Sequence, residues 1–249
     1  QADDKKDARG MAIKILGVSG KKILENDDQA MTQDFIMINH PVFFVDEPHR
    51  YLAFIEDMNS KSTLKKLHVP FALGFQGTIN ALRASNSKIS NPLQARYWSM
   101  VPYQLGLGAD RQAVKYSARP CSSHLDQIPN KPSPNFLREA LQNTLNKNDA
   151  CMEFLIQPRT SNKMLIEDSM TEWQETQAPF YQVATIHIPQ QIFDTPEQNQ
   201  FCENLSFTPW HSLPEHRPLG AINRLRKVIY ENISLIRHEM NSAPRKEPQ

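Results

Sequence analysis

Segments in which apolar and polar residues alternate recur along the chain, and this pattern is typical of half-buried β-strands. The segment 34–45 is more strongly apolar and contains Pro41. It predicts a strand that breaks at the proline, because a central strand does not accommodate this residue. The alternating segments that predict further strands are 11–17, 113–118, 151–157 and 182–188.

Apolar residues at helical spacing predict a second set of elements. The longest such signal runs from 221 to 241, and shorter ones lie at 51–58 and 134–146. Mixed helical signals occupy 71–85 and 94–105, with a break between them at an Asn-Pro pair.

The remaining long stretches predict loops. Residues 21–32 are charged, 119–134 are rich in proline, and 193–219 are polar, aromatic and proline-rich with little periodicity. No internal repeat and no clear linker interrupts the chain, so residues 1–249 predict a single domain. Strands in the first two-thirds followed by a long helix predict an α+β fold, with an antiparallel sheet or barrel and packed helices.

The composition is that of an ordinary globular protein. Of 249 residues, 39% are hydrophobic and 22% are charged, and 28 Lys and Arg stand against 27 Asp and Glu. A net charge of +1 gives no reason to expect nucleic acid or an anionic membrane as the main partner. No apolar run approaches the roughly 18 residues of a membrane-spanning helix, and no glycine-rich phosphate loop is present.

The three cysteines, Cys121, Cys151 and Cys202, are far apart and form no metal-ligating spacing. We therefore expect no disulfide framework, and three reduced, mostly buried thiols. Together with an N-terminal segment that lacks the apolar core of a signal peptide, this predicts a cytoplasmic protein.

The last predicted helix carries an unusual set of side chains on one face. Arg226, Tyr230 and Arg237 share that face because they are spaced at i, i+4 and i+11. Apolar residues flank the face and are expected to bury it, namely Leu225, Val228, Ile229 and Ile236. Buried arginines need an anionic partner. The spacing alone is also that of a structural helix with surface arginines.

Haem is one anionic partner that suits this face. Its ferric iron accepts a tyrosinate ligand, and its propionates suit the guanidinium fork. An arginine one turn before the tyrosine would stabilise the phenolate, since opposite charges lie close together. The pattern R-x-x-x-Y on a helix therefore has a chemical reason.

The stretch 207–237 resembles the proximal haem segment of the catalase superfamily. That segment contains an F-x-P turn, a later proline, R-x-x-x-Y and a further arginine, matched by Phe207, Pro209, Pro214, Arg226, Tyr230 and Arg237. The resemblance implies haem b with Tyr230 as the axial iron ligand and Arg226 as its charge partner. It implies Arg237 as a propionate contact, and Phe207 and Ile222 as further haem contacts.

Other segments resemble the same family in the right order. DARGMAIK at 7–14 looks like the family's D-P-R-G-F-A-V-K, and DFIMINHPVFF at 34–44 looks like the strand that ends in N-N-T-P-I-F-F. Phe43 and Phe44 match the aromatic pair of that strand. Tyr51, with Phe54, matches the following F-x-x-F, whose first ring stacks on the haem. Weaker similarities lie at 97–105, 114–120, 134–141 and 152–157.

The resemblance is closest to the short catalase-like haem proteins. The C-terminal flavodoxin-like domain of large catalases and the usual nucleotide-binding segments have no counterpart, so NADPH binding is not expected. The family's distal V-H-A-K-G-like motif and R-F-S strand are not found either. We therefore expect an N-terminally incomplete chain or a degenerate member of the family.

The distal asparagine of the family falls at Ile38, with Asn39 beside it. Neighbouring residues of a strand point to opposite faces, so a slip or bulge would be needed for Asn39 to act as the catalytic amide. His40 stands at the family's threonine position and is interpreted as a hydrogen-bonded structural histidine. The other histidines interpreted as structural are His187, His211, His216 and His238.

These observations predict a catalase-like antiparallel β-barrel with surrounding helices. The predicted function is a haem-dependent oxidoreductase that acts on peroxide, by disproportionation or with an organic reductant. Alternatives are a non-catalytic haem-binding or degenerate structural domain and a fatty-acid hydroperoxide isomerase. The oligomeric state stays open, with a homo-oligomer as one possibility.

Two other motifs carry less weight. The carboxylates at 167–175 are interpreted as solvated helix charge rather than as the paired acids of a hydrolase. Ser122-Ser123-His124 lacks the strand–turn–helix context of a nucleophile elbow. No zinc or calcium motif is present.

Overall fold

Seven strands form one antiparallel sheet in the computed structural model, which describes residues 2–243, 245, 247 and 248. The strand order is β1-β2-β3-β5-β6-β7, and β4 pairs with β5 outside this path. The strands are β1 (Gly10–Leu16), β2 (Thr32–Ile38), β3 (Tyr97–Trp98), β4 (Tyr103–Leu105), β5 (Gln112–Pro120), β6 (Ala150–Pro158) and β7 (Tyr181–Ile188).

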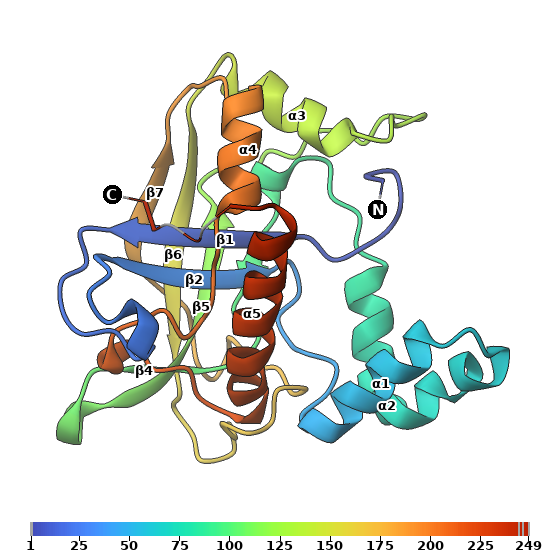
Figure 1. Ribbon diagram of the computed structural model, residues 1–249, viewed down its shortest axis with the longest axis vertical. Helices are drawn as coiled ribbons and strands as arrows, with labels where there is room; N and C mark the ends of the chain where they lie inside the picture. Colours follow the sequence, from blue (N-terminus) through green and yellow to red (C-terminus); the bar gives the residue numbers. More distant parts are fainter. Residues whose placement is uncertain (1, 244, 246, 249) are drawn as a thin grey trace.

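The sheet curls into a half-barrel. β1 and β2 pair over their whole length, from Gly10↔Ile38 to Leu16↔Thr32, whereas β2 joins β3 through the single pair Ile38↔Trp98. This narrow junction lets the β1–β2 hairpin cross the long β5, β6 and β7 strands, as Figure 1 shows. The prediction of an α+β fold with an antiparallel sheet is confirmed. The sheet is an open half-barrel rather than a closed barrel, because no pairing joins β1 to β7 over the described residues.

Aromatic rings fill the inside of the curl. Phe35 of β2 makes edge contacts with Tyr116 of β5 and Phe154 of β6, at centroid distances of 5.0 and 5.1 Å. Tyr103 of β4 lies 4.9 Å from Tyr116. Rings contributed by four strands therefore hold the two halves of the sheet together, as expected for edge and offset aromatic packing.

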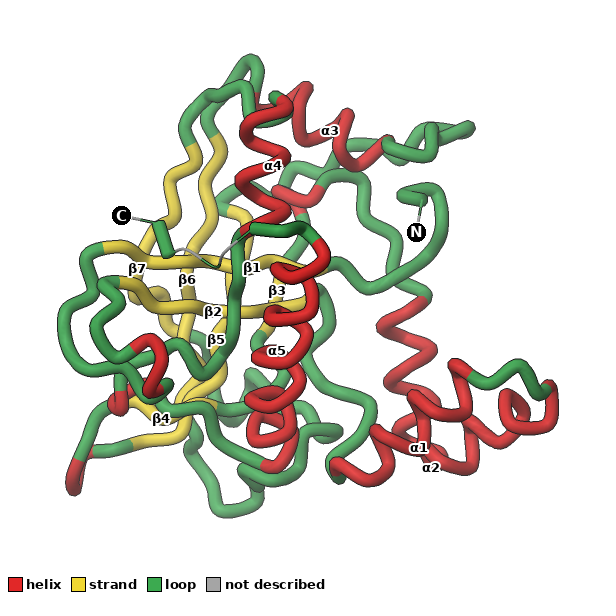
Figure 2. The backbone as a smooth tube through the Cα atoms, in the orientation of Figure 1, coloured by secondary structure: helices red, strands yellow, loops and turns green. Residues whose placement is uncertain are grey.

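Helices surround this sheet. They are α1 (Pro48–Asn59), α2 (Thr63–Ser85), α3 (Phe136–Leu145), α4 (Pro196–Asn204) and α5 (Ala221–Met240). The first turn of α5 enters the core through Ile222, which is 3% exposed. α1 and α2 stand out from the sheet on one side (Figure 1, Figure 2). No described helix is both long enough and apolar enough to cross a lipid bilayer.

α2 bends sharply in its middle at Gly74, whose φ of 69° and ψ of 177° are not helical. A residue with a side chain rarely adopts this left-handed φ, and glycine therefore permits the bend. One turn later, Gly77 lies against the carbonyl oxygen of Phe44, and an added Cβ would stand 2.5 Å from it. The second half of α2 can approach the 43–45 segment only because residue 77 lacks a side chain.

Most sequence predictions of elements are confirmed, but three are wrong. The segment 94–105 forms short strands rather than a helix, because Tyr97 and Tyr103 are drawn into the core beside β5. The 167–175 segment is irregular rather than helical, and its own Trp173 is buried. α4 was expected to be loop; its N-cap Thr195 accepts a hydrogen bond from the backbone of Gln198.

The prediction of three reduced thiols is also wrong. Cys121 and Cys151 form a disulfide, with Cα atoms 5.5 Å apart, and Cys202 is free and exposed. The pairing follows from the β5–β6 register, which aligns Pro120 with Met152 and therefore brings the two cysteines together. The argument from reduced thiols to a cytoplasmic location loses its premise.

Candidate functional site

Arg226 and Tyr230 of α5 interact directly, one helical turn apart. Nη2 of Arg226 donates to the Tyr230 hydroxyl at 3.2 Å, and the guanidinium carbon lies 5.1 Å from the centre of the tyrosine ring. The i, i+4 spacing on an α-helix places the two side chains on the same face, so the helix alone is enough to make this contact.

The Arg226 guanidinium is buried, and its partners are neutral. Nη1 donates to the Tyr103 hydroxyl at 3.4 Å and to Oδ1 of Asn223 at 3.2 Å. Across the described part of the chain, no carboxylate forms an ion pair with it. Burial opposes the charge of Arg226, but its interactions with the Tyr103 and Tyr230 hydroxyls outweigh burial, so the pKa of Arg226 lies above its ordinary value. The site therefore favours an anion beside Arg226.

Asn223 fixes the position of the Arg226 guanidinium through a hydrogen bond. Its Nδ2 donates to the carbonyl oxygens of Pro102 and Leu219, both at 3.0 Å, which leaves Oδ1 free to accept from Arg226. Its own carbonyl oxygen accepts a hydrogen bond from Nε1 of Trp210. A buried hydrogen-bond network of this kind holds the arginine in one position.

A cavity of about 200 Å³ lies over this pair. Its wall is apolar except for the guanidinium of Arg226 and the phenols of Tyr230 and Tyr51. The lining residues are Ile38, Phe43, Tyr51, Met100, Ile222, Leu225, Arg226, Ile229 and Tyr230.

Tyr51 faces the same cavity from α1. Its ring lies 5.9 Å from that of Phe43 and 6.2 Å from that of Phe44, which in turn contacts Phe54 at 5.1 Å. Burial raises the pKa of the Tyr51 phenol, and Tyr230 acts in the same direction while Arg226 opposes them. Tyr51 therefore presents a neutral aromatic wall at ordinary pH, with Phe44 packed behind it rather than in the lining.

The structure brings five predicted site residues together at this cavity and leaves others outside its lining. Phe43, Tyr51, Ile222, Arg226 and Tyr230 line it. Phe44 supports the wall from behind, and the ring of Phe207 lies under the Lys14 ammonium at 5.1 Å, away from the lining.

Arg237 lies outside the lining as well. Its Nη2 donates to the carbonyl oxygen of Leu205 and to the Ser206 hydroxyl, the latter at 3.1 Å. Its Nε is buried and has no hydrogen-bond partner among the described residues. Val228 and Ile236, expected to bury this helix face, are 58% and 55% exposed. The far half of α5 is therefore more open than its apolar residues suggested.

Asn39 is engaged on the side away from the cavity. Its Oδ1 accepts from the backbone of Arg9 at 2.7 Å, and its Nδ2 donates to the Ser87 hydroxyl at 2.7 Å. Ile38, not Asn39, lines the cavity, as the alternation of a strand requires. β2 pairs with β1 in an unbroken register up to Ile38, so no bulge turns Asn39 inward.

Four of the five histidines have the hydrogen bonds expected of structural residues. His187 contacts Asp149, His211 lies between Asp27 and Thr32, His216 contacts Gln33, and His238 contacts Ser206. His40 differs, because its buried Nε2 has no partner in the described residues. Burial, and then the charge of Arg83, lowers the pKa of His40.

Tyr103, Asn223 and Met100 were not predicted as site residues. Tyr103 comes from the three-residue strand β4, which is too short to show any periodicity. Met100 has a φ of 63°, a left-handed conformation that is uncommon outside glycine and that turns its side chain to the cavity wall. Only Asn223, one turn before Arg226 on the same helix, could have been found from spacing.

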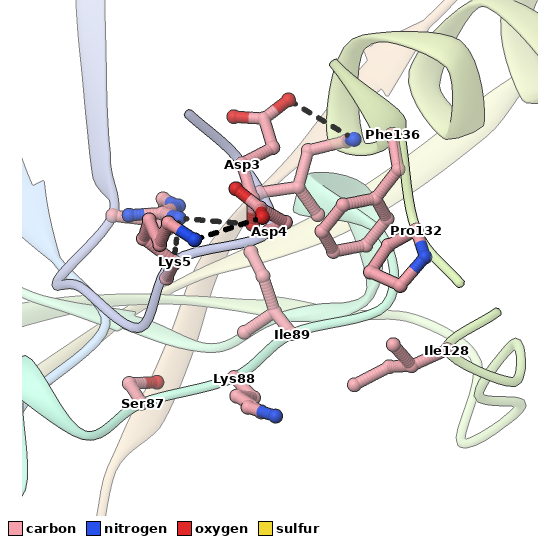
Figure 3. A pocket seen from close by; sticks show the side chains of 11 residues that line it. Asp3, Asp4, Lys5, Ser87, Lys88, Ile89, Ile128, Pro132 and Phe136 are labelled. Carbon is pink, nitrogen blue, oxygen red and sulfur yellow. Dashed lines mark hydrogen bonds and ion pairs between the residues drawn. The ribbon is translucent and has the colours of Figure 1, made fainter. Parts of the chain in front are cut away.

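Other hollows are poorer candidates. Figure 3 shows one near the N-terminus, where Asp3 accepts a hydrogen bond from the Leu137 backbone and Ile89, Ile128 and Phe136 gather beside it. Its volume of about 30 Å³ suits roughly one water molecule. A groove of about 400 Å³ between His40, Arg83 and Glu172 is larger but open.

The residues at the 200 Å³ cavity fit a haem in their donor chemistry. A tyrosine oxygen is available as a ligand, a buried cation stands beside it, and aromatic and aliphatic side chains form the wall. The volume is below the roughly 300–1,000 Å³ of typical ligand pockets, so the match rests on chemistry rather than on size. No group of three or more His, Cys, Asp or Glu among the described residues could hold a bare metal ion.

Comparisons with known proteins identify the fold. No protein-family model and no curated protein sequence matches the chain. Among solved structures, a fungal catalase is similar with a TM-score of 0.70 and 18% identity over 96% of this chain and 49% of that one. Catalase A from Saccharomyces cerevisiae is similar with a TM-score of 0.66 and 17% identity over 95% of this chain and 50% of that one.

The protein therefore has a catalase-like fold, as the sequence resemblance predicted. It spans about half the length of the two catalases. At this level of identity the likeness establishes the fold, and function has to be argued from the site.

Proposed function

We propose that this chain binds haem b at the cavity over α5, with Tyr230 as the iron ligand, and acts on peroxide as a catalase- or peroxidase-like oxidoreductase. The observation that carries the proposal is the buried Arg226 guanidinium, which contacts the Tyr230 hydroxyl and has no carboxylate partner among the described residues. A buried cation without an anion is unfavourable, and a tyrosinate provides that anion.

Each residue of the cavity has a role in this proposal. Arg226 stabilises the phenolate form of Tyr230, and Asn223 and Tyr103 hold the guanidinium in place. Ile38, Met100 and Ile222 exclude water from the phenolate, which strengthens its attraction to Arg226. Tyr51 offers a ring face along the wall. When bound, haem supplies the redox chemistry toward peroxide.

Peroxide chemistry also needs a group that relays a proton between the two peroxide oxygens. No histidine is among the residues that line the cavity, and both ends of the Asn39 amide are bonded elsewhere. Ile38 at the distal position favours a second candidate, a haem-binding domain without peroxide turnover. A catalytic role of Asn39 would require its amide to leave Arg9 and Ser87. A propionate contact of Arg237 would require its guanidinium to leave Leu205 and Ser206.

The test is a titration of the full chain with haemin, followed by absorption spectroscopy and an assay of hydrogen peroxide consumption. We expect a Soret band with high-spin ferric tyrosinate features that is lost or shifted in Tyr230→Phe. The matched control is Tyr181→Phe, a half-exposed tyrosine on β7 outside the cavity. A spectrum unchanged by Tyr230→Phe would exclude Tyr230 as the ligand.

The assay separates the two candidates. Haem binding with peroxide consumption well above that of free haemin supports the oxidoreductase. Haem binding through Tyr230 with no such consumption supports the non-catalytic domain. A chain that stays colourless after haemin addition contradicts both.

A further inference from the structure

The first half of α2 exposes an apolar face that no described part of the chain covers. Leu64, Leu67 and Phe71 are 79%, 65% and 79% exposed, and Phe75, just after the bend, is 85% exposed. The spacing i, i+3 and i+7 places the first three on one side of the helix. Large side chains are rarely so exposed together on a soluble surface, which marks the face as an interaction site.

The opposite side of the same helix holds it to the protein. Val69 packs against the main core, and Leu73 is 3% exposed. The helix is therefore anchored through one face, and Leu64, Leu67 and Phe71 point away from the fold. α1 and α2 stand out from the sheet (Figure 1, Figure 2), and the high exposure of Leu64, Leu67 and Phe71 shows that the described chain leaves this face open.

Exposed lysines lie on the other sides of the first helical turn and just before it. Lys61, Lys65 and Lys66 are exposed, and none of them has an acidic partner among the described ion pairs. From Pro48 to Ser85 the chain carries five Lys and Arg against two Asp and Glu, whereas the whole chain has a net charge of only +1. The small net charge of the whole chain gave no reason to expect an anionic partner, but these two helices carry a local positive charge.

This combination distinguishes one kind of partner. Leucine and phenylalanine on one face with lysines on the polar side is the pattern of helices that lie in a membrane interface. Protein interfaces are depleted in lysine, which makes a protein partner a poorer match. The exposed apolar residues of α5, such as Leu235 and Ile236, have Glu231, Arg237 and Glu239 near them in sequence, so charges of both signs surround them.

We propose that the α1–α2 unit docks on a lipid bilayer that carries anionic headgroups. Leu64, Leu67, Phe71 and Phe75 enter the boundary between headgroups and acyl chains, and the lysines contact the headgroups. The helix lies in the plane of the membrane and does not cross it. Tyr51 of α1 lines the cavity at Tyr230, so docking brings a bilayer to the helix pair that forms one wall of that cavity.

The test is co-sedimentation of the full chain, without haemin, with vesicles of phosphatidylcholine alone and with 30 mol% phosphatidylserine as a chosen composition, roughly at physiological salt. We expect binding to the anionic vesicles that weakens as salt is raised, because exposed charges are screened. Phe71→Ser/Phe75→Ser should weaken vesicle binding at least tenfold. Lys61→Glu/Lys65→Glu/Lys66→Glu should also weaken it, by about fivefold or more for each lysine replaced.

Matched controls carry equivalent changes elsewhere on the surface. Leu235→Ser/Ile236→Ser removes comparably exposed apolar residues from α5, and Lys147→Glu/Lys163→Glu removes exposed lysines outside α1 and α2. Both should bind vesicles as the unchanged chain does. Thermal unfolding of every variant shows whether it is folded, and all of the changed side chains are exposed.

Three outcomes would overturn the proposal. The first is no binding of the unchanged chain to anionic vesicles. The second is binding that Phe71→Ser/Phe75→Ser leaves intact while a control variant weakens it. The third is a dimer in solution that Phe71→Ser/Phe75→Ser dissociates in the absence of any vesicle binding, which would make a second copy of the chain the occupant. None of these results depends on haem or on peroxide consumption.

Discussion

The guanidinium of Arg226 and the hydroxyl of Tyr230 lie 3.2 Å apart at the base of an apolar cavity. The contact forms within one helix, but residues of β4, α1 and the first turn of α5 determine its surroundings. Tyr103 of β4 and Asn223 of α5 hold the arginine, while Tyr51 of α1 closes the wall in front of Tyr230. Function is argued from this arrangement because it places a buried cation where the described residues provide no buried anion.

Replacing Arg226 should weaken haemin binding. We expect Arg226→Gln to raise the dissociation constant for haemin at least tenfold, because loss of the charge destabilises the tyrosinate. Arg226→Lys should lose less, since it keeps the charge but cannot reach Tyr103, Asn223 and Tyr230 at once. The measurement is a Soret-band titration. The control is Arg224→Gln, because Arg224 is an exposed arginine on the same helix as Arg226 and pairs with Glu167. Equal affinities for the Arg226 and Arg224 variants would contradict the prediction.

How far the sequence predicts this site depends on whether the relevant contacts are local. Arg226 and Tyr230 could be paired from spacing because a helix of known pitch brings residues i and i+4 together. The contact of Arg226 with Tyr103 could not be predicted from spacing, because the two residues are 123 positions apart and their contact depends on how β4 pairs with β5. The placement of Ile38 in the cavity, and of Asn39 outside it, followed correctly from strand alternation.

The errors have the same origin. The Cys121–Cys151 disulfide depends on the β5–β6 register, which composition does not reveal. The propionate role of Arg237 came from the family resemblance, and its present contacts with Leu205 and Ser206 depend on where the chain before α5 passes, which helix spacing does not reveal. The overall fold was predictable because ordered matches along most of the chain resemble one family, and the structural comparison supports the same fold.

Removing the disulfide should destabilise the fold. The bond closes a loop with a sequence separation of 30, for which chain entropy predicts a contribution of about 3.6 kcal/mol. We expect Cys121→Ser/Cys151→Ser to lower the free energy of unfolding by roughly this amount in urea under oxidising conditions, and dithiothreitol to remove the difference from the unchanged chain. Cys202→Ser, at the free exposed cysteine, is the control and should have no effect. Identical midpoints for oxidised and reduced protein would count against the prediction.

Lys115 of β5 should make stability depend on pH in the alkaline range. It is 4% exposed, its Nζ lies 4.9 Å from the Trp173 ring, and no described residue accepts a hydrogen bond from it. Burial lowers the pKa of Lys115 from 10.5 to about 8, although the charges of Asp168 and Glu172 act in the opposite direction. The folded state therefore resists protonation of this amine.

The direction of the effect follows from proton linkage. Below pH about 8 both states bind the proton, and burial of the charge costs on the order of 3 kcal/mol. Between about 8 and 10.5 only the unfolded state binds it, so stability rises with pH. We expect Lys115→Met to be more stable than the unchanged chain at pH 7 and to lose this rise, measured by urea unfolding at several pH values. Lys147→Met, at an exposed lysine, should keep it. A Lys115→Met protein less stable at pH 7 would refute the argument.

Gly77 of α2 should connect packing to the candidate site. An added Cβ would stand 2.5 Å from the carbonyl oxygen of Phe44, and a backbone atom cannot move aside as a flexible side chain can. We expect Gly77→Ala to destabilise the fold by roughly 1–3 kcal/mol, the usual range for overpacking. The displaced 43–45 segment carries Phe43, so haemin affinity should fall as well. Gly10→Ala is the matched control, because its Cβ would meet only the Met37 carbonyl oxygen at 3.7 Å. If urea midpoints and haemin affinities of the two alanine variants coincide, α2 does not approach the 43–45 segment as closely as the contact at Gly77 requires.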